Sequence, residues 1–148
     1  MRVLLKLILD CPPDAAWNAI RSPDVFRAVS FPLSTFTSLE PGGFPEQWAA
    51  GEHPVLVKAL GLVAVGEQVI DISFPPTRNG VRRVVDRGRG FPGITKWEHT
   101  MAVSAAPGDR TLYRDQLKFD GPLVLWPLFW AFWQWRAIGL TRLAPAFH

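Results

Sequence analysis

The most informative stretch of this sequence is LVLWPLFWAFWQWRAIGLTRL, which covers residues 123–143. Its length and its scarcity of turn residues predict one long helix, with Pro127 tolerated near the first turns. Projected at 100° per residue, one face collects apolar side chains and a single arginine: Leu125, Phe129, Phe132, Trp133, Arg136, Leu140 and Leu143. Arg136 and Arg142 leave the apolar run short of the roughly 20 residues that cross a bilayer. We therefore expect a helix that packs on protein and no transmembrane segment.

Upstream of this helix, the pattern is that of strands. The Gly121-Pro122 break separates the helix from a series of extended segments: 33–40, two strands within 54–74 broken near Gly61, 81–87, 95–104 and 111–119. At the N-terminus, Val3, Leu5, Leu7 and Leu9 alternate with outward positions and predict a first strand. Antiparallel pairing through short turns gives a sheet of six to seven strands.

Two short helices are expected directly after the first strand. The prolines and the aspartate of Pro12-Pro13-Asp14 suit the first turn of a helix over Pro13–Ile20. Ser22-Pro23-Asp24 then gives an N-cap signal for a second helix that ends near Ala28. The predicted fold class is therefore α+β, in the order strand, two short helices, antiparallel strands and one long helix.

The composition predicts a single domain that spans residues 1–148 and has an apolar interior. The chain has 148 residues, 48% of them hydrophobic, with seven tryptophans and ten phenylalanines, which suits one core or an apolar cavity. The net charge of +3 comes from scattered arginines, so no nucleic-acid partner is expected. Cys11 is the only cysteine and cannot form an internal disulfide, which fits a cytoplasmic protein. We expect a monomer or a weak homodimer.

The sequence contains none of the common cofactor or metal motifs. There is no phosphate loop, dinucleotide fingerprint, zinc-binding helix or nucleophile elbow, and the glycines of segment 88–93 do not open a helix. We therefore expect no cofactor and no metal, and we interpret segment 88–93 as a loop that closes one end of a cavity.

Three polar residues fall on faces that are otherwise apolar. His99 shares a strand face with Trp97 and Met101, and Asp115 shares one with Tyr113. If the two strands are neighbours, His99 and Asp115 converge with Arg136, and a carboxylate compensates the buried guanidinium. Asp115 is the expected partner of Arg136, with Glu98 as the alternative if the strand phase is shifted by one residue. Such a group is either a structural network or a ligand anchor.

Several motifs together resemble the START-like superfamily, and within it the polyketide cyclase/dehydrase-like branch. They are Trp97-Glu98-His99, Thr111-x-x-x-Asp115, the Gly121-Pro122 break and FWAFWQWR at residues 129–136. The resemblance covers essentially the whole chain. It implies a helix-grip fold, in which a curved sheet wraps the last helix around an internal cavity for lipids, sterols, polyketides or other hydrophobic molecules.

The expected function is therefore the binding of a hydrophobic small molecule. The expected ligand-binding residues come from the last helix and two strands: Arg136, Asp115, His99, Trp97, Met101, Tyr113, Phe129, Phe132 and Trp133. One alternative is a cyclase or dehydratase in which His99 is the catalytic base and Arg136 holds an enolate oxygen. Another is a protein-interaction or membrane-peripheral module that uses Trp126 and Trp130, which project away from the inner face.

Overall fold

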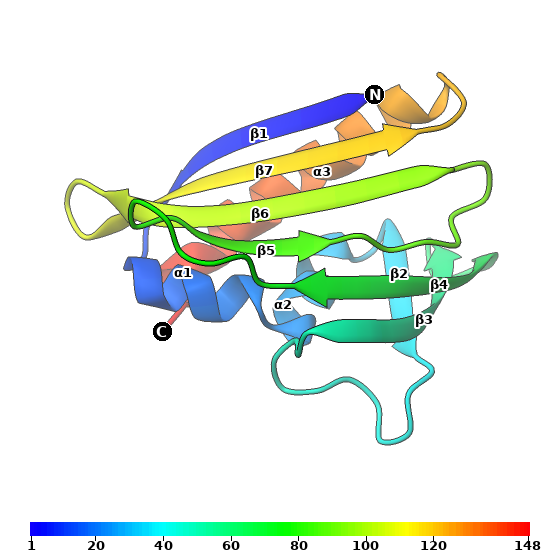
Figure 1. The fold of residues 1–148 in the computed structure, drawn as a ribbon, viewed down its shortest axis with the longest axis horizontal. Coiled ribbons are helices and arrows are strands. Elements are labelled where there is room, and N and C mark those ends of the chain that lie inside the picture. The colour runs from blue at the N-terminus through cyan, green and yellow to red at the C-terminus, as the bar shows by residue number, and fades with distance from the viewer.

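The computed structural model describes residues 1–148, which form seven strands and three α-helices (Figure 1). In chain order these are β1 (Arg2–Leu9), α1 (Pro13–Ile20), α2 (Pro23–Ser30), β2 (Ser34–Ser38), β3 (Gly51–Ala59), β4 (Val63–Ser73), β5 (Arg82–Asp86), β6 (Lys96–Ala106), β7 (Arg110–Asp120) and α3 (Leu125–Leu143). A single 3-10 turn, Ala144–Ala146, follows α3. Neither α3 nor any other helix combines the length and apolarity that crossing a bilayer requires.

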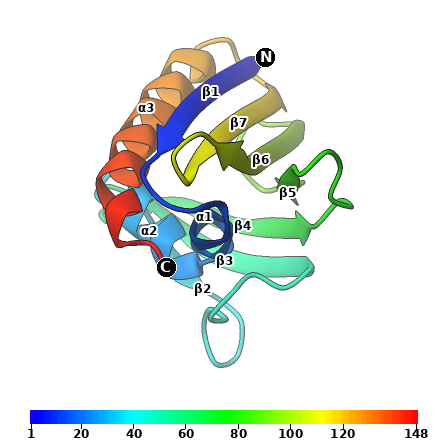
Figure 2. The same ribbon diagram turned by 90° about the vertical axis from the view of Figure 1, so that its left-hand side faces the viewer.

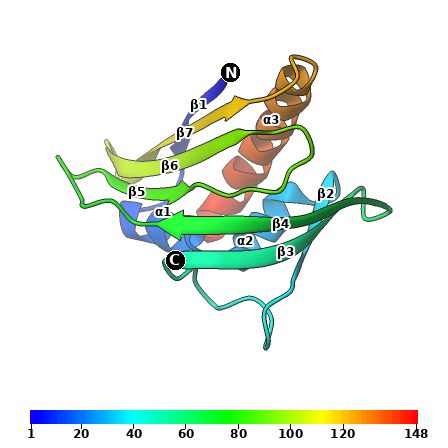
Figure 3. The ribbon, with the colours of Figure 1, turned by 45° about the vertical axis from the view of Figure 1, so that its right-hand side comes forward.

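The seven strands form one antiparallel sheet in the order β1-β7-β6-β5-β4-β3-β2. The sheet is strongly curved and does not close, and α3 lies along its inner side (Figure 2). Figure 3 shows α3 crossing behind the sheet, with α1 and α2 near the C-terminal end of the helix. This arrangement is the helix grip expected from the sequence.

Local sequence explains how the two short helices begin. Pro13 and Pro23 each occupy the first helical turn, where a missing backbone N–H costs nothing. The Ser22 hydroxyl accepts a hydrogen bond from the Val25 N–H at 3.3 Å and so caps α2. α2 packs against α3 and β2, so it closes the gap that the curved sheet leaves beside the long helix.

The order of elements along the chain, the two short helices and the long final helix are confirmed, and some boundaries differ. β3 begins at Gly51, before Pro54, and β2 covers only Ser34–Ser38. The inward position of Leu143 was wrong, because this side chain is 37% exposed. The inner stripe of α3 passes from Leu140 to the fully buried Ala144, one turn later, which leaves Leu143 on the outside.

Candidate functional site: an apolar cavity with a buried arginine

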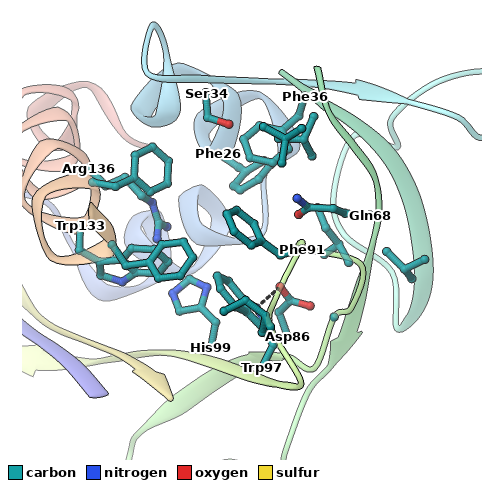
Figure 4. Close-up of a pocket in the computed structure, with 18 of the residues that line it drawn as sticks. Phe26, Ser34, Phe36, Gln68, Asp86, Phe91, Trp97, His99, Trp133 and Arg136 are labelled. Atoms are coloured by element: carbon teal, nitrogen blue, oxygen red, sulfur yellow. Dashed lines mark hydrogen bonds between the residues drawn. The ribbon is translucent and has the colours of Figure 1, made fainter. Parts of the chain in front are cut away.

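A cavity of about 470 Å³ lies between the inner side of the sheet, α2 and α3 (Figure 4). This volume is within the usual range for small-molecule sites. Of its 26 lining residues, 19 are hydrophobic and one is Gly88, so polar side chains are the exception: Ser34, Gln68, Asp86, Arg89, His99 and Arg136. A site of this kind recognises a ligand mainly by shape, with orientation left to a few polar atoms.

Aromatic side chains from β6, α3 and a loop form one wall of the cavity. The Phe129 ring meets the rings of Trp97 and Phe91 edge to face, at centroid distances of 5.5 and 5.2 Å. The Trp133 ring is 6.3 Å from Trp97 and 5.7 Å from Phe132. These edge contacts fix the orientation of the rings and give the cavity a defined surface.

Phe91 reaches the cavity because the loop after β5 lies tightly against β4. Arg89 pairs with Val69 by two backbone hydrogen bonds of 2.9 and 3.0 Å. A Cβ on Gly88 would lie 2.3 Å from the Val69 carbonyl oxygen, and one on Gly90 would lie 2.8 Å from the Glu67 carbonyl oxygen. Glycine is therefore required at both positions, and the loop forms part of the cavity wall.

A buried carboxylate, Asp115, lies at the centre of a polar cluster behind the aromatic wall. Its Oδ1 accepts hydrogen bonds from His99 Nε2 at 2.7 Å and from Trp133 Nε1 at 2.8 Å. Its Oδ2 accepts one from the Tyr113 hydroxyl at 2.5 Å and lies 3.8 Å from Arg136 Nη1. β6 and β7 bring these groups together, because Met101 pairs with Asp115 and sets His99 diagonally opposite.

The partners of Asp115 keep it ionised. Burial alone raises the pKa of this carboxyl, but the charges and hydrogen bonds of His99, Arg136 and Tyr113 lower it to about 2. Burial and the neighbouring Asp115 carboxylate raise the pKa of Tyr113 well above its ordinary value, so the phenol stays neutral and donates its proton. Asp115 therefore carries a negative charge at neutral pH.

Arg136 is buried, at 4% exposure, and its hydrogen bonds are incomplete. Its guanidinium carbon lies 4.8 Å from the centre of the Trp133 ring, and Nη2 donates a weak 3.9 Å bond to the Met101 sulfur. The contact with Asp115 is long, at 3.8 Å, and the buried Nε has no partner. Arg136 also lines the cavity, so the guanidinium brings to it hydrogen-bond capacity that the protein does not use fully.

His99 presents its second ring nitrogen without a protein partner. Its Nε2 faces an ionised carboxylate, which can only accept, so Nε2 carries a proton. In the neutral imidazole, Nδ1 is then the nitrogen with the free lone pair. No protein group hydrogen-bonds to Nδ1, and His99 lines the cavity. The ring can therefore accept a proton or a hydrogen bond from a ligand.

The other carboxylate at the cavity, Asp86, is engaged in holding the sheet together. β4 and β5 share only two paired positions, and beyond them Asp86 Oδ1 accepts the Asp71 N–H at 2.9 Å. Its Oδ2 accepts Trp97 Nε1 at 3.3 Å. Burial raises the pKa of Asp86, and these hydrogen bonds and the charge of His99 oppose the rise. The Asp86 side chain thus supplies a hydrogen bond between β4 and β5 where backbone pairing has ended.

The structure brings together most residues that the sequence singled out. Seven of them line the cavity: Trp97, His99, Met101, Phe129, Phe132, Trp133 and Arg136. Asp115 and Tyr113 do not line it and lie behind it, in hydrogen-bond contact with His99 and Trp133. Glu98 is not the partner of Arg136, because it faces the other side of β6 and bonds to Arg87 at 3.0 Å.

Trp126 and Trp130 lie outside the cavity, as the helix projection indicated. They are 40% and 47% exposed. The indole N–H of Trp126 donates to the Arg2 carbonyl at 2.8 Å, so this side chain ties the start of α3 to the edge strand β1. Trp126 therefore has a structural contact that accounts for part of its surface.

Sequence reasoning missed four polar residues of the cavity: Ser34, Arg89, Gln68 and Asp86. The signal for the last two was present, because Gln68 is in phase with Ile70 and Ile72 along β4, and all three line the cavity. Asp86 is likewise in phase with the fully buried Val84 on β5. Alternation by two identifies both as inward-facing.

Comparison with known proteins identifies the fold. No family model and no curated protein sequence matches the chain. Among solved structures, protein CV1439 from Chromobacterium violaceum superposes with a TM-score of 0.68 at 14% identity, covering 97% of this chain and 96% of that one. A START superfamily protein from Mycobacterium smegmatis matches with a TM-score of 0.63 at 11% identity, covering 98% and 97% of the two chains.

A third match carries an activity in its name. The Zhui aromatase/cyclase from Streptomyces sp. R1128 matches with a TM-score of 0.63 at 12% identity, covering 99% of this chain and 92% of the other. Taken together, these likenesses show that the chain has the START-like, helix-grip fold that its motifs resembled. Identities this low show the fold alone and carry no further assignment.

Proposed function

We propose that this protein binds a hydrophobic small molecule in the cavity and holds an oxygen atom of that molecule at Arg136. The observation that carries the proposal is the buried guanidinium, which lines a mostly apolar cavity and has an unpartnered Nε. Burying a charged group without all of its hydrogen bonds costs free energy. A ligand atom that accepts the missing hydrogen bond would offset this cost, and this favours binding.

The contacts around Arg136 favour a carboxylate or another acidic oxygen on the ligand. Asp115 already accepts three short hydrogen bonds and stands 3.8 Å from the guanidinium, so it neutralises the arginine only in part. A guanidinium also presents a planar fork that matches a carboxylate, and the surrounding aromatic rings exclude water. Fatty acids and aromatic acids of suitable size are the simplest representatives of this class.

Binding of plain fatty acids, measured by isothermal titration calorimetry, tests this proposal. Arg136→Met keeps the packing of the stem and removes the donors, so we expect affinity for the acids to fall about 10- to 100-fold, as for loss of a charged hydrogen bond. Arg142→Met is the matched control, because Arg142 lies exposed on the same helix and outside the cavity. Equal affinities in the Arg136 variant and the wild type would show that the guanidinium does not anchor the ligand.

Proton abstraction from a bound ligand is a second candidate, favoured by the free Nδ1 of His99. With Asp115 orienting the ring through Nε2, Nδ1 can take a proton from a carbon between two carbonyls, and Arg136 can stabilise the enolate oxygen. The likeness to an aromatase/cyclase agrees with this chemistry.

Exchange of the methylene protons of an aromatic 1,3-diketone, followed by NMR in deuterated buffer, tests the second candidate. If His99 is a general base, His99→Asn slows exchange about 100-fold and changes probe affinity only a few-fold. Exchange no faster than in buffer with the wild-type protein would leave binding as the function.

A further inference from the structure

Gln68 is a further polar side chain of the cavity with an unpartnered atom. It extends from β4, on the opposite side of the cavity from Arg136 and α3 (Figure 4). Its backbone is fixed, because it lies in a strand paired with β3 and the loop at Gly90 passes directly over it. The amide therefore reaches the interior from a rigid position.

The Gln68 amide makes no hydrogen bond within the protein. Its Nε2 is buried and unpartnered, and no protein donor meets its Oε1. Exchanging the two amide atoms does not remove the problem, because the buried position would then hold an oxygen that also lacks a partner. An apolar side chain would fill the same space at lower cost, as the neighbouring Ile70 and Ile72 do, so the amide calls for a partner from outside the chain.

The surroundings of Gln68 favour a neutral partner. Asp86 lies on the same side of the cavity, and both of its oxygens already accept hydrogen bonds. A second anion there would face that carboxyl in an apolar environment, whereas a hydroxyl, carbonyl or ether oxygen would not. Arg89, the one cation of this wall, is already engaged by Glu52 in a two-point contact of 2.7 and 3.2 Å.

We propose that Gln68 is a second anchoring point, so that the cavity selects two-ended ligands: an apolar body with an acidic oxygen held at Arg136 and a neutral hydrogen-bonding oxygen held at Gln68. This inference rests on the proposed binding function and names its ligand class more narrowly. The 19 hydrophobic lining residues accommodate the body between the two polar ends.

Titration calorimetry with ω-hydroxy fatty acids and plain fatty acids of equal chain length tests the inference. Chains of about eight to fourteen carbons suit a cavity of this size. At the length that spans the cavity, we expect the wild-type protein to bind the hydroxy acid about 2- to 10-fold more tightly than the plain acid, the usual contribution of one neutral hydrogen bond.

Two variants separate this inference from the proposed function. Gln68→Leu should abolish the preference for the hydroxy acid while binding the plain acid at least as tightly as the wild type does. Gln116→Leu is the matched control, because Gln116 lies on β7 and outside the cavity lining, and it should keep the preference.

Three outcomes would overturn the inference. If the wild type shows no preference at any chain length, or if Gln68→Leu retains it, the amide is satisfied by water and Gln68 is no anchor. In both cases a loss of plain-acid binding in Arg136→Met would still support the proposed function. If neither series of acids binds the wild type, the proposed function fails for acids and the inference fails with it.

Discussion

The polar cluster around Asp115 and the neighbouring cavity differ in how completely their buried polar groups are hydrogen-bonded. Behind the aromatic wall, Asp115 accepts hydrogen bonds from His99, Tyr113 and Trp133, all of them 2.8 Å or shorter. On the cavity side, Arg136 Nε and Gln68 Nε2 are buried without any partner. The fold accounts for a buried polar group whose hydrogen bonds are all made within the protein. A buried polar group at a cavity that lacks such partners is accounted for by a molecule that enters the cavity.

This difference assigns separate roles to neighbouring residues. Asp115 acts through the protein, because it fixes the orientation of His99 and Trp133 and partly compensates Arg136. Arg136 and Gln68, in contrast, each keep a buried donor without a partner in the unliganded protein. Substitution on the two sides should therefore separate loss of stability from loss of binding.

The largest expected effect is that of Asp115→Ala. The change leaves three donors and the Arg136 charge buried without their acceptor, so we expect the free energy of unfolding to fall by about 3 to 5 kcal/mol. Denaturant unfolding followed by tryptophan fluorescence measures this loss. Asp10→Ala, at an exposed position, is the control and should change stability by less than about 0.5 kcal/mol. A loss below about 1 kcal/mol in Asp115→Ala would contradict the structural role.

Acid should weaken the same cluster by a smaller amount. Because its neighbours lower the pKa of Asp115 to about 2, the ionised form stabilises the fold above the ordinary value near 4. That contribution, about 2 kcal/mol, is lost as the pH falls from about 4 towards 2. Unfolding measured across this range should show a shallower decline in Asp115→Asn than in the wild type. Parallel curves would mean that Asp115 does not titrate as described.

The fold could be predicted from sequence because its signals are local. The alternation of Val3, Leu5, Leu7 and Leu9, the Ser22 cap and the length of 123–143 each define an element within a few residues. The Gly121-Pro122 break separates the last strand from the helix without any tertiary information. The element order then restricts the topology to few arrangements.

The site could be predicted only in part, because it depends on how distant elements pack. Strand phase placed His99 and Asp115 inward and left Glu98 as the alternative for a phase shifted by one residue. The structure excludes that alternative, because Glu98 pairs with Arg87. The contact of Trp133 with the Asp115 carboxylate depends on the angle between α3 and the sheet, which no local pattern encodes. Tyr113, in contrast, lies two residues before Asp115 on the same face of β7. Gln68 was not predicted as a site residue, because its distinguishing feature is an amide without a hydrogen-bond partner. A sequence does not show which side chains lack such partners.

The smallest expected change in stability is that of Gln68→Leu in the unliganded protein. This variant also tests most directly whether the two sides of the buried region differ. Leucine has a volume similar to that of glutamine and removes an amide that makes no protein hydrogen bond, so the free energy of unfolding should stay within about 0.5 kcal/mol of the wild type or rise by up to about 1 kcal/mol. Chemical denaturation of delipidated protein is the measurement, with Gln68→Glu as a companion that should destabilise by burying a charge beside Asp86. A clear loss of stability in Gln68→Leu would mean that the amide is bound within the protein, by water or otherwise, and that the two sides of the buried region do not differ as described.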